Sequence, residues 1–307
     1  MTPKWRLEQI PDQSGRTAVV TGANSGLGLE TSRELARAGA RVVMACRNTV
    51  KGETAAAEIS KDVADAQLQV AELDLSDLAS VRQFASGLDA TAFDLLINNA
   101  GIMMTPEEKT ADGFELQIGT NHLGHFALTG LLLARLGKGA DPRVVTLSSI
   151  EHKGGHIHLD DLDLENGYAP RKAYQQSKLA NASFGLELDR RLRAASSPIK
   201  SVLAHPGYSD TNLQSTGPTG PMKAILAVSN KLLAQGAAEG AHPTLYAATA
   251  PDVEGGDYYG PDGFQEMRGR PTKVRVIAEG RDPEMARALW ELSEERTGVS
   301  YKIGPVH

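Results

Sequence analysis

A glycine-rich turn between an apolar run and an amphipathic segment constrains the fold of this chain more than any other feature. Residues 17–20 are apolar and partly β-branched, as in a buried strand, and the turn at residues 21–28 follows them directly. Apolar residues then recur at helical spacing as far as Gly39, and residues 41–46 form a second apolar run. This order predicts a βαβ unit. Its first turn either serves packing alone or offers backbone amides to a phosphate.

Further apolar runs alternate with helical segments along the chain. Strands are predicted at residues 68–73, 93–97, 143–147, 201–204 and 257–259, and helices near 51–64, 78–88, 112–136, 237–250 and 283–296. The alternation predicts an α/β fold with a doubly wound parallel sheet of the Rossmann type, in a single domain that covers residues 1–307.

Composition excludes several classes of function. The chain has 307 residues and a formal net charge of -6, which argues against nucleic acid as the main partner. Its one cysteine, Cys46, cannot form an intrachain disulfide. The first 13 residues are polar, without an apolar run of signal-peptide length, and no stretch approaches a membrane span. We therefore expect a cytoplasmic location.

The end of the second predicted strand bears on the choice of nucleotide. Units that bind NAD carry an acidic residue about 20 positions after the glycine turn, where it binds the ribose 2′-hydroxyl. This chain has Cys46, Arg47 and Asn48 there, without an acid. Arg47 would suit a 2′-phosphate, which favours NADP(H) over NAD(H). The alternative is that Arg47 is a solvated charge at a strand end.

Tyr174 and Lys178 are four residues apart, so they share one face of a helix. A lysine ammonium beside a phenol favours phenolate, which would lower the phenol pKa from its usual value of about 10. A tyrosine tuned in this way can move a proton to or from an alcohol or carbonyl oxygen. The same spacing also describes an ordinary exposed pair, so its meaning depends on the rest of the chain.

Histidines and acids gather in two places without a metal-ligand pattern. His122 and His125 lie in the predicted helix 112–136, but no cysteine or acid of matching spacing accompanies them. We interpret them as helix-surface or packing residues. Residues 151–171 are rich in His and Asp and are interpreted as a polar surface excursion near the site. No metal site is predicted.

Together these motifs resemble the short-chain dehydrogenase/reductase family over nearly the whole chain. The glycines at 22, 26 and 28 match the cofactor loop of its shorter branch, and the other motifs follow in the family's order: Asn98-Asn99-Ala100-Gly101, Ser149, the Tyr174/Lys178 pair and Pro206-Gly207. Residues 45–48 and the long spacing from Ser149 to Tyr174 are similar to the retinol dehydrogenase and protochlorophyllide reductase relatives.

The resemblance implies hydride transfer between a nicotinamide and an alcohol or carbonyl carbon. Tyr174 would be the acid/base, and Lys178 would hold the nicotinamide ribose and lower the tyrosine pKa. Ser149 would bind the substrate oxygen, and Asn121 would support a water chain. Asp74 and Leu75 resemble the adenine contacts, with Asn98 as the support below them, and Thr211 resembles the carboxamide contact. The implied cofactor contacts are Gly22, Asn24, Ser25, Gly26, Leu27, Gly28, Arg47, Asn48, Asp74, Leu75, Asn98, Ala100, Gly101, Tyr174, Lys178, Pro206, Gly207 and Thr211.

Two other functions stay open on the same fold: reduction of a carbon–carbon double bond, and a non-catalytic dinucleotide-binding sensor. Residues 208–235 are a Ser/Thr/Gly/Pro-rich loop followed by an apolar stretch, which is either a lid over a small, apolar alcohol or carbonyl substrate or simply a core helix. The position of this stretch after the loop favours the lid. The family commonly pairs the helices that carry Asn121 and Tyr174, so a homo-oligomer is expected.

Replacing Arg47 by aspartate should reverse the nucleotide preference. A guanidinium–phosphate contact is charge-assisted and can be bidentate, so its loss should weaken NADPH binding roughly tenfold or more. Titration of the wild type and Arg47→Asp with NADPH and NADH checks this. A wild type that binds both nucleotides equally well would show that Arg47 does not select the cofactor.

Overall fold

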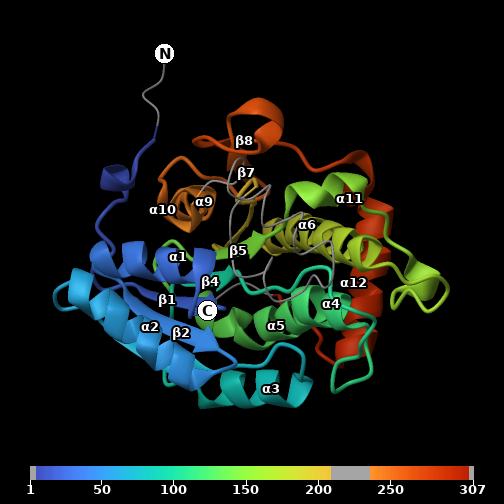
Figure 1. Cartoon of the computed structure of the whole chain (residues 1–307), viewed down its shortest axis with the longest axis horizontal. Helices are drawn as coiled ribbons and strands as arrows, with labels where there is room; N and C mark the ends of the chain where they lie inside the picture. The colour runs from blue at the N-terminus through green and yellow to red at the C-terminus, as the bar shows by residue number, and fades with distance from the viewer. Residues whose placement is uncertain (1–4, 209–235, 304–307) are drawn as a thin grey trace.

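The computed structural model describes residues 5–208 and 236–303, which are arranged around one sheet of eight strands (Figure 1). The strand order is β3-β2-β1-β4-β5-β6-β7-β8. Each neighbouring pair from β3 to β7 is parallel, and β8 runs antiparallel to β7. The predicted Rossmann-type parallel sheet is confirmed.

Strands β1 to β7 follow the apolar runs of the sequence closely, whereas the short edge strand β8 was not predicted because its residues are not an apolar run. They are β1 (Thr17–Thr21), β2 (Arg41–Cys46), β3 (Leu68–Glu72), β4 (Leu95–Asn98), β5 (Arg143–Leu147), β6 (Lys200–Ala204), β7 (Tyr258–Pro261) and β8 (Pro271–Lys273). The longer helices are α1 (Gly26–Arg37), α2 (Thr49–Asp62), α3 (Leu78–Gly87), α5 (Gly124–Leu136), α6 (Pro170–Ala194), α10 (His242–Thr249) and α12 (Pro283–Thr297).

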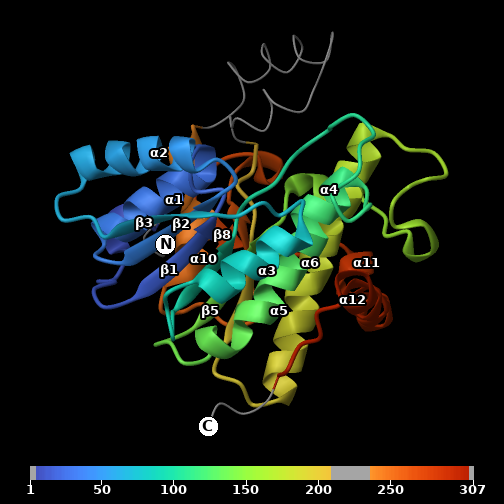
Figure 2. The ribbon, with the colours of Figure 1, turned by 90° about the horizontal axis from the view of Figure 1, so that it is seen from below.

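Helices cover both faces of the sheet, and Figure 2 shows α1 and α2 on one side of the strands and α3 and α5 on the other. Every residue of β4 and β5 is buried, as expected for parallel strands packed on two sides. On the second face Phe126 of α5 and Phe184 of α6 pack against Trp290, which anchors α12 outside them. These two cores fix the positions of the strand ends.

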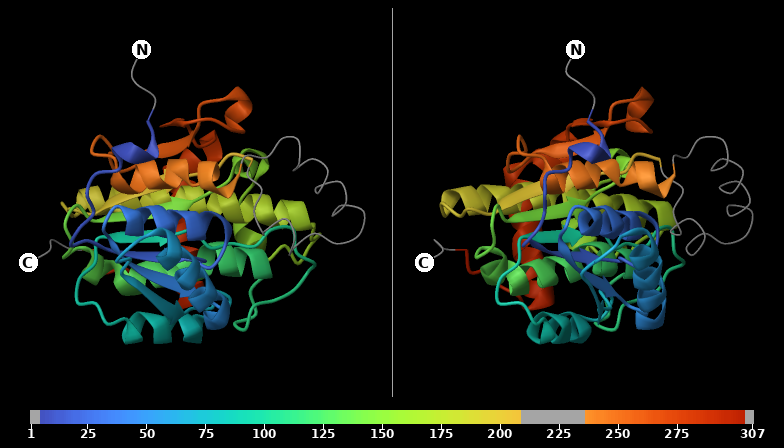
Figure 3. Two further views of the ribbon diagram at one scale, coloured as in Figure 1. Left: turned by 60° about the vertical axis from the view of Figure 1, so that its left-hand side comes forward. Right: turned by 90° about the vertical axis from the view of Figure 1, so that its left-hand side faces the viewer.

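Helix α6 has 25 residues and runs through much of the molecule (yellow-green in Figure 3). Pro170 stands in its first turn, where the missing amide proton costs nothing and the fixed φ suits a helix. From that start the helix carries Tyr174 and Lys178 past the ends of the central strands. Both side chains are buried.

The helix predicted at residues 112–136 begins later than expected. A turn with Gly113 at φ +85° comes first, and Glu115 then caps the helix by accepting from the amides of Gln117 and Ile118. One turn of α-helix, α4 (Leu116–Ile118), passes through a π-helical segment, η2 (Gly119–Leu123), into α5. The capping carboxylate sets the start, which apolar periodicity alone could not locate.

Two other sequence expectations need correction. The helix predicted at 237–250 is divided into α9 (Ala237–Gly240) and α10, and Pro243 stands in the first turn of α10. Residues 151–171 are not simply a polar excursion. They contain two short 3₁₀ helices, η3 (Ile150–Gly154) and η4 (Leu159–Asp161), and bury Ile157, Leu162 and Leu164. The predicted lid at 208–235 lies outside the described residues except for Tyr208.

Substituting Gly124 by alanine should destabilise the protein, although alanine is the better helix former. A Cβ at Gly124 would overlap the carbonyl oxygen of Leu75, so the backbone must shift at a cost of about 1–3 kcal/mol in the free energy of unfolding. Gly87 in α3 has no atom within 4 Å of such a Cβ, so Gly87→Ala should be neutral or gain up to about 1 kcal/mol. Urea unfolding of both variants checks the contrast. Equal stability would show that α5 does not approach Leu75 this closely.

Candidate functional site

The residues singled out in the sequence meet where the central parallel strands end. The glycine turn follows β1, Asn98 and Asn99 end β4, Ser148 and Ser149 follow β5, and His205 follows β6. In open α/β sheets this carboxyl edge is the usual place for ligands. The sheet therefore brings together motifs that lie more than 180 residues apart.

The glycine turn is shaped by close backbone packing. Gly22 has φ +66°, and a Cβ there would lie 3.0 Å from Ala100 Cα. Gly26 has φ +54°, and a Cβ at Gly28 would overlap the Gly22 carbonyl. Ser25 is the N-cap of α1 but makes no side-chain cap hydrogen bond. The turn thus has the tight geometry and the uncapped helix N-terminus that a pyrophosphate site requires.

The hydroxyl of Thr21 joins this turn to the neighbouring strand and helix. Its Oγ1 accepts from the amides of Asn99 and Ala100, both at 2.9 Å, and lies 2.9 Å from His125 Nε2. His125 Nδ1 lies 2.9 Å from the Asn121 carbonyl oxygen, so Nδ1 carries the proton and Nε2 accepts from Thr21. Burial lowers the pKa of His125 to about 4, which keeps the ring neutral.

The predicted nucleotide-selecting residues stand at the end of β2. Arg47 is exposed and makes no hydrogen bond or ion pair with another residue of the described chain. Asn48 has a structural task that the sequence did not suggest, because its side chain caps α2 by accepting from the Lys51 amide at 2.9 Å. The Arg47 guanidinium is therefore available to an anionic ligand.

The predicted adenine contacts lie beyond β3. The Asp74 carboxylate accepts from the amide and the hydroxyl of Ser76, at 2.9 and 2.6 Å, which fixes the turn after the strand. Leu75 is buried. Asn98 is fully buried and donates to Thr129 Oγ1 at 3.0 Å, as suits a supporting residue.

The four candidate catalytic residues, here called the tetrad, are Asn121, Ser149, Tyr174 and Lys178, and they come from three segments of the chain. Tyr174 and Lys178 lie on α6, and the lysine amino group is 5.8 Å from the centre of the tyrosine ring. Ser149 hydrogen-bonds Tyr174, whereas the Ser148 hydroxyl donates to the Lys178 carbonyl and so holds the helix. The Asn121 side chain accepts from the Ile102 amide at 2.8 Å and donates to its carbonyl at 3.0 Å. Asn121 thereby holds the backbone just after Gly101.

The Lys178 amino group is poorly satisfied by the protein. It is 4% exposed, and the one hydrogen bond that the described residues offer it is to the Leu147 carbonyl at 3.4 Å. A Cβ at Gly101 would lie 3.3 Å from this nitrogen, so the glycine leaves the space beside it open. A buried ammonium with one weak acceptor fits a site whose ligand brings further oxygen atoms.

The structure reverses the pKa direction predicted for Tyr174. Burial of the phenol raises its pKa to about 12, and the hydrogen bond from Ser149 only partly opposes this. Burial lowers the pKa of Lys178 to about 8. The sequence predicted a lowered phenol pKa from charge proximity alone. The effect of desolvation on the phenol pKa is larger than the effect of the nearby lysine charge, because neither buried group has the water that would stabilise its charged form.

The Pro206–Gly207 turn after β6 is held by residues that the sequence analysis missed. Gly207 has φ +70°, and its amide donates to His205 Nδ1 at 3.2 Å. The next amide, of Tyr208, donates to the Met267 carbonyl at 2.7 Å. Neither His205 nor Glu266, which contacts it, was singled out from the sequence. Thr211 lies outside the described residues.

His152 is a further residue that sequence reasoning missed. It is buried, and its Nδ1 donates to the Ser149 carbonyl at 2.7 Å. His122 and His125 are buried too, which confirms packing rather than a helix surface. No group of three His, Cys, Asp or Glu suited to a metal occurs among residues 5–208 and 236–303. Within the same ranges no helix is long and apolar enough to cross a membrane.

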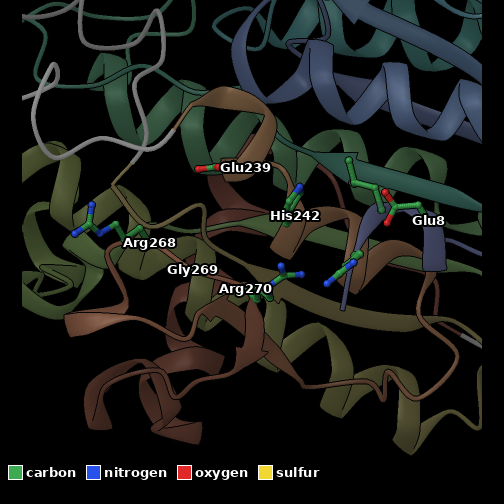
Figure 4. Close-up of a pocket in the computed structure, with 8 residues that line it drawn as sticks. Glu8, Glu239, His242, Arg268, Gly269 and Arg270 are labelled. Atoms are coloured by element: carbon green, nitrogen blue, oxygen red, sulfur yellow. The ribbon is translucent and has the colours of Figure 1, made fainter. Parts of the chain in front are cut away.

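A separate hollow of about 450 Å³ lies between the N-terminal turn η1 (Leu7–Gln9), α10 and the connection before β8 (Figure 4). Its charged side chains are Arg268, Arg270 and Arg6 against Glu8 and Glu239. Arg270 already donates to the Trp5 carbonyl. None of the lining residues belongs to the predicted site, so we locate that site at the strand ends.

Comparison with known proteins places these features in context. The family model described as short chain dehydrogenase matches residues 16–220. The chain is 41% identical to human retinol dehydrogenase 12 over 301 residues, covering 96% of this chain and 89% of the relative. It is 42% identical to human retinol dehydrogenase 11 over 294 residues, covering 95% and 87%.

The chain is also similar in sequence and fold to solved structures. An uncharacterized protein from Mycobacterium paratuberculosis is 48% identical, with a TM-score of 0.82 over 97% of this chain and 99% of that chain. The Pseudomonas aeruginosa RhlG/NADP active-site complex is 25% identical, with a TM-score of 0.63 over 80% and 94%.

Replacing Lys178 by methionine should stabilise the protein at neutral pH. The pKa of Lys178 is about 8 in the fold against 10.5 unfolded, so its buried charge costs stability below pH 8, and the cost disappears as pH rises to 10.5. Methionine has similar length and no charge, so Lys178→Met should unfold at higher denaturant, by at most about 3 kcal/mol at pH 7. The advantage over wild type should shrink between pH 8 and 10.5. A difference that does not change with pH would contradict the buried charge.

Proposed function

This chain belongs to the short-chain dehydrogenase family, and we propose that it is an NADP(H)-dependent oxidoreductase of small, apolar alcohols and carbonyl compounds. Family membership and the likeness to retinol dehydrogenases make it an NAD(P)-dependent oxidoreductase. The choice of NADP(H), the role of Tyr174 and the substrate class are our inference. The observation that carries it is the buried, under-satisfied Lys178 amino group beside Tyr174.

The residues present fit a dinucleotide. The glycine turn and the uncapped N-terminus of α1 would hold the pyrophosphate, and Lys178 would donate to the ribose hydroxyls beside Gly101. Arg47 is the candidate for the 2′-phosphate. The NADP in the RhlG complex supports this choice by analogy. A nicotinamide cofactor supplies the hydride, and the protein's part is to orient the reactants and move the proton.

Tyr174 is the proposed proton carrier. With a pKa near 12 the phenol is fully protonated at neutral pH, so it is ready to give a proton to a carbonyl oxygen that gains a hydride. Ser149 would hold that oxygen, since it bonds to Tyr174 and its neighbour Ser148 is occupied with α6. In the oxidative direction the phenol must first lose its proton. A cationic Lys178 and a bound cofactor cation would both favour that loss.

The names of the relatives point to the substrate class. Retinol is an apolar primary alcohol, and retinol dehydrogenases 11 and 12 are about 40% identical to this chain. We extend to this chain the class of apolar primary alcohols and aldehydes. Assays with retinal, aliphatic aldehydes and enones, each with NADPH and with NADH, test the substrate and the cofactor together. Turnover of enones alone would favour the double-bond reductase.

Tyr174→Phe should lower turnover roughly 10²–10⁴-fold, because it removes the proton donor while the ring still packs. NADPH affinity should change little, because Lys178 and the glycine turn remain. Turnover on any substrate that the wild type accepts, measured with NADPH binding by fluorescence, checks this. Near-wild-type turnover with intact binding would rule out Tyr174 as the donor. If the wild type binds NADPH but turns over none of these substrates, the result would favour the sensor over the oxidoreductase.

A further inference from the structure

One carboxylate outside the tetrad connects two segments of the site. Glu266 Oε1 lies 2.8 Å from Lys153 Nζ, in the 3₁₀ helix η3 that follows Ser149. Its Oε2 lies 3.2 Å from Nε2 of His205, the residue before the Pro206–Gly207 turn. The Glu266 side chain is 24% exposed and His205 is 0% exposed. The carboxylate therefore contacts Lys153 in the segment that follows Ser149, and His205, which precedes the predicted cofactor-binding turn.

The His205 ring is hydrogen-bonded to Glu266 on one side and to the Gly207 amide on the other, so its orientation links the two residues. The Gly207 amide donates to Nδ1, so in the neutral ring Nε2 carries the proton and donates to Glu266. The ring has no room to turn, because a Cβ at Gly260 would overlap it and the Tyr258 ring centre lies 5.2 Å away. The orientation of the Gly207 amide thus depends on the bond that Glu266 accepts.

A second contact comes from the residue after Glu266. The Met267 carbonyl accepts from the Tyr208 amide at 2.7 Å, and a Cβ at Gly207 would overlap that same carbonyl. Two successive amides of the turn, those of Gly207 and Tyr208, are therefore set by the short helix η5 (Phe264–Glu266) and the residue after it.

The backbone that presents Glu266 is strained. Gln265 has φ +51° and Glu266 has φ +58°, the left-handed region that non-glycine residues seldom adopt. Strain of this kind persists only where surrounding contacts hold it, and it often marks a functional position. The hydrogen bonds from His205 and Lys153 lower the pKa of Glu266 to about 2 against the effect of burial, so the carboxylate stays charged.

We propose that Glu266 is a positioning residue that sets the cofactor-side turn through His205 and the Ser149 segment through Lys153. It would act on two partners of the reaction without touching either. This inference rests on the proposed function, since it assigns Glu266 to that same site. A residue that only stabilised the fold would change the unfolding temperature and leave the affinity of the folded protein for NADPH unchanged.

The test compares Glu266→Gln with Glu279→Gln. Glutamine keeps the size of the side chain and one acceptor oxygen but removes the charge that holds both partners. Glu279 is a matched control. Its side chain is also 24% exposed and also binds a histidine, His156, together with the Ile157 amide, but it contacts neither the Pro206–Gly207 turn nor Lys153. NADPH affinity and steady-state kinetics are measured well below the unfolding temperature of each variant.

Glu266→Gln should raise the Kd of NADPH about tenfold and lower kcat, because hydrogen bonds to a charged partner are the stronger kind and small misplacements in a site are costly. Glu279→Gln should match the wild type in both. Lys153→Met breaks only the bond on the Ser149 side, so it should lower kcat while the Kd of NADPH stays within about twofold. His205→Asn keeps an acceptor near the Gly207 amide but loses reach to Glu266, so it should resemble Glu266→Gln.

Failure of this inference differs from failure of the proposed function. If the wild type does not bind NADPH or any dinucleotide, the proposed function is wrong. If the wild type binds and turns over normally, and folded Glu266→Gln has the same Kd and kcat, then Glu266 is not a positioning residue. Equal loss of function in Glu266→Gln and Glu279→Gln would likewise overturn it, because the effect would then be general to this surface.

Discussion

The arrangement of the site depends on how the single hydroxyl of Thr21 is shared. It accepts the amide protons of Asn99 and Ala100 and donates to His125, so the ends of β1 and β4 and the helix α5 meet at one buried oxygen. His125 carries the connection onward to the Asn121 carbonyl. Displacing any of these groups would leave a buried polar atom unpaired, which is costly. The glycine turn and the helix segment that carries Asn121 are therefore held in fixed positions relative to each other by one hydrogen-bond network.

Buried histidines hold backbone groups by hydrogen bonds at two other places in the site. His152 holds the Ser149 carbonyl and His205 holds the Gly207 amide, as His125 holds the Asn121 carbonyl. Burial lowers the pKa of all three rings, so each stays neutral, with one donor and one acceptor nitrogen. A neutral imidazole can orient a backbone group in the interior without the desolvation cost of a charge. Rigid backbone near a reacting group is what orientation requires.

Helix α6, in contrast, carries two buried groups that can be charged at or above neutral pH. Lys178 and Tyr174 are both buried. Burial raises the pKa of Tyr174 and lowers that of Lys178, and both shifts favour the neutral form of the side chain. A buried charge with few partners costs stability, and groups with strongly shifted pKa values cluster at functional sites, so this pair is the candidate for the chemistry of the site. The protein supplies few partners for the lysine, and the proposed cofactor would supply the rest. The site gives up stability so that its electrostatics match a ligand.

The sequence alone determined the alternation of strands and helices, the glycine turn and the tetrad candidates, because periodicity and short-range spacing are local properties. Residues 41–46 and 143–147 were predicted to the residue. Tertiary structure decided the rest. The start of the helix that carries Asn121 depends on the Glu115 cap, and the tasks of His125, His152 and His205 depend on carbonyl and amide groups supplied by folding. The pKa of Tyr174 rises where spacing predicted a fall, since desolvation is set by every segment packed around a side chain, and no local pattern records it.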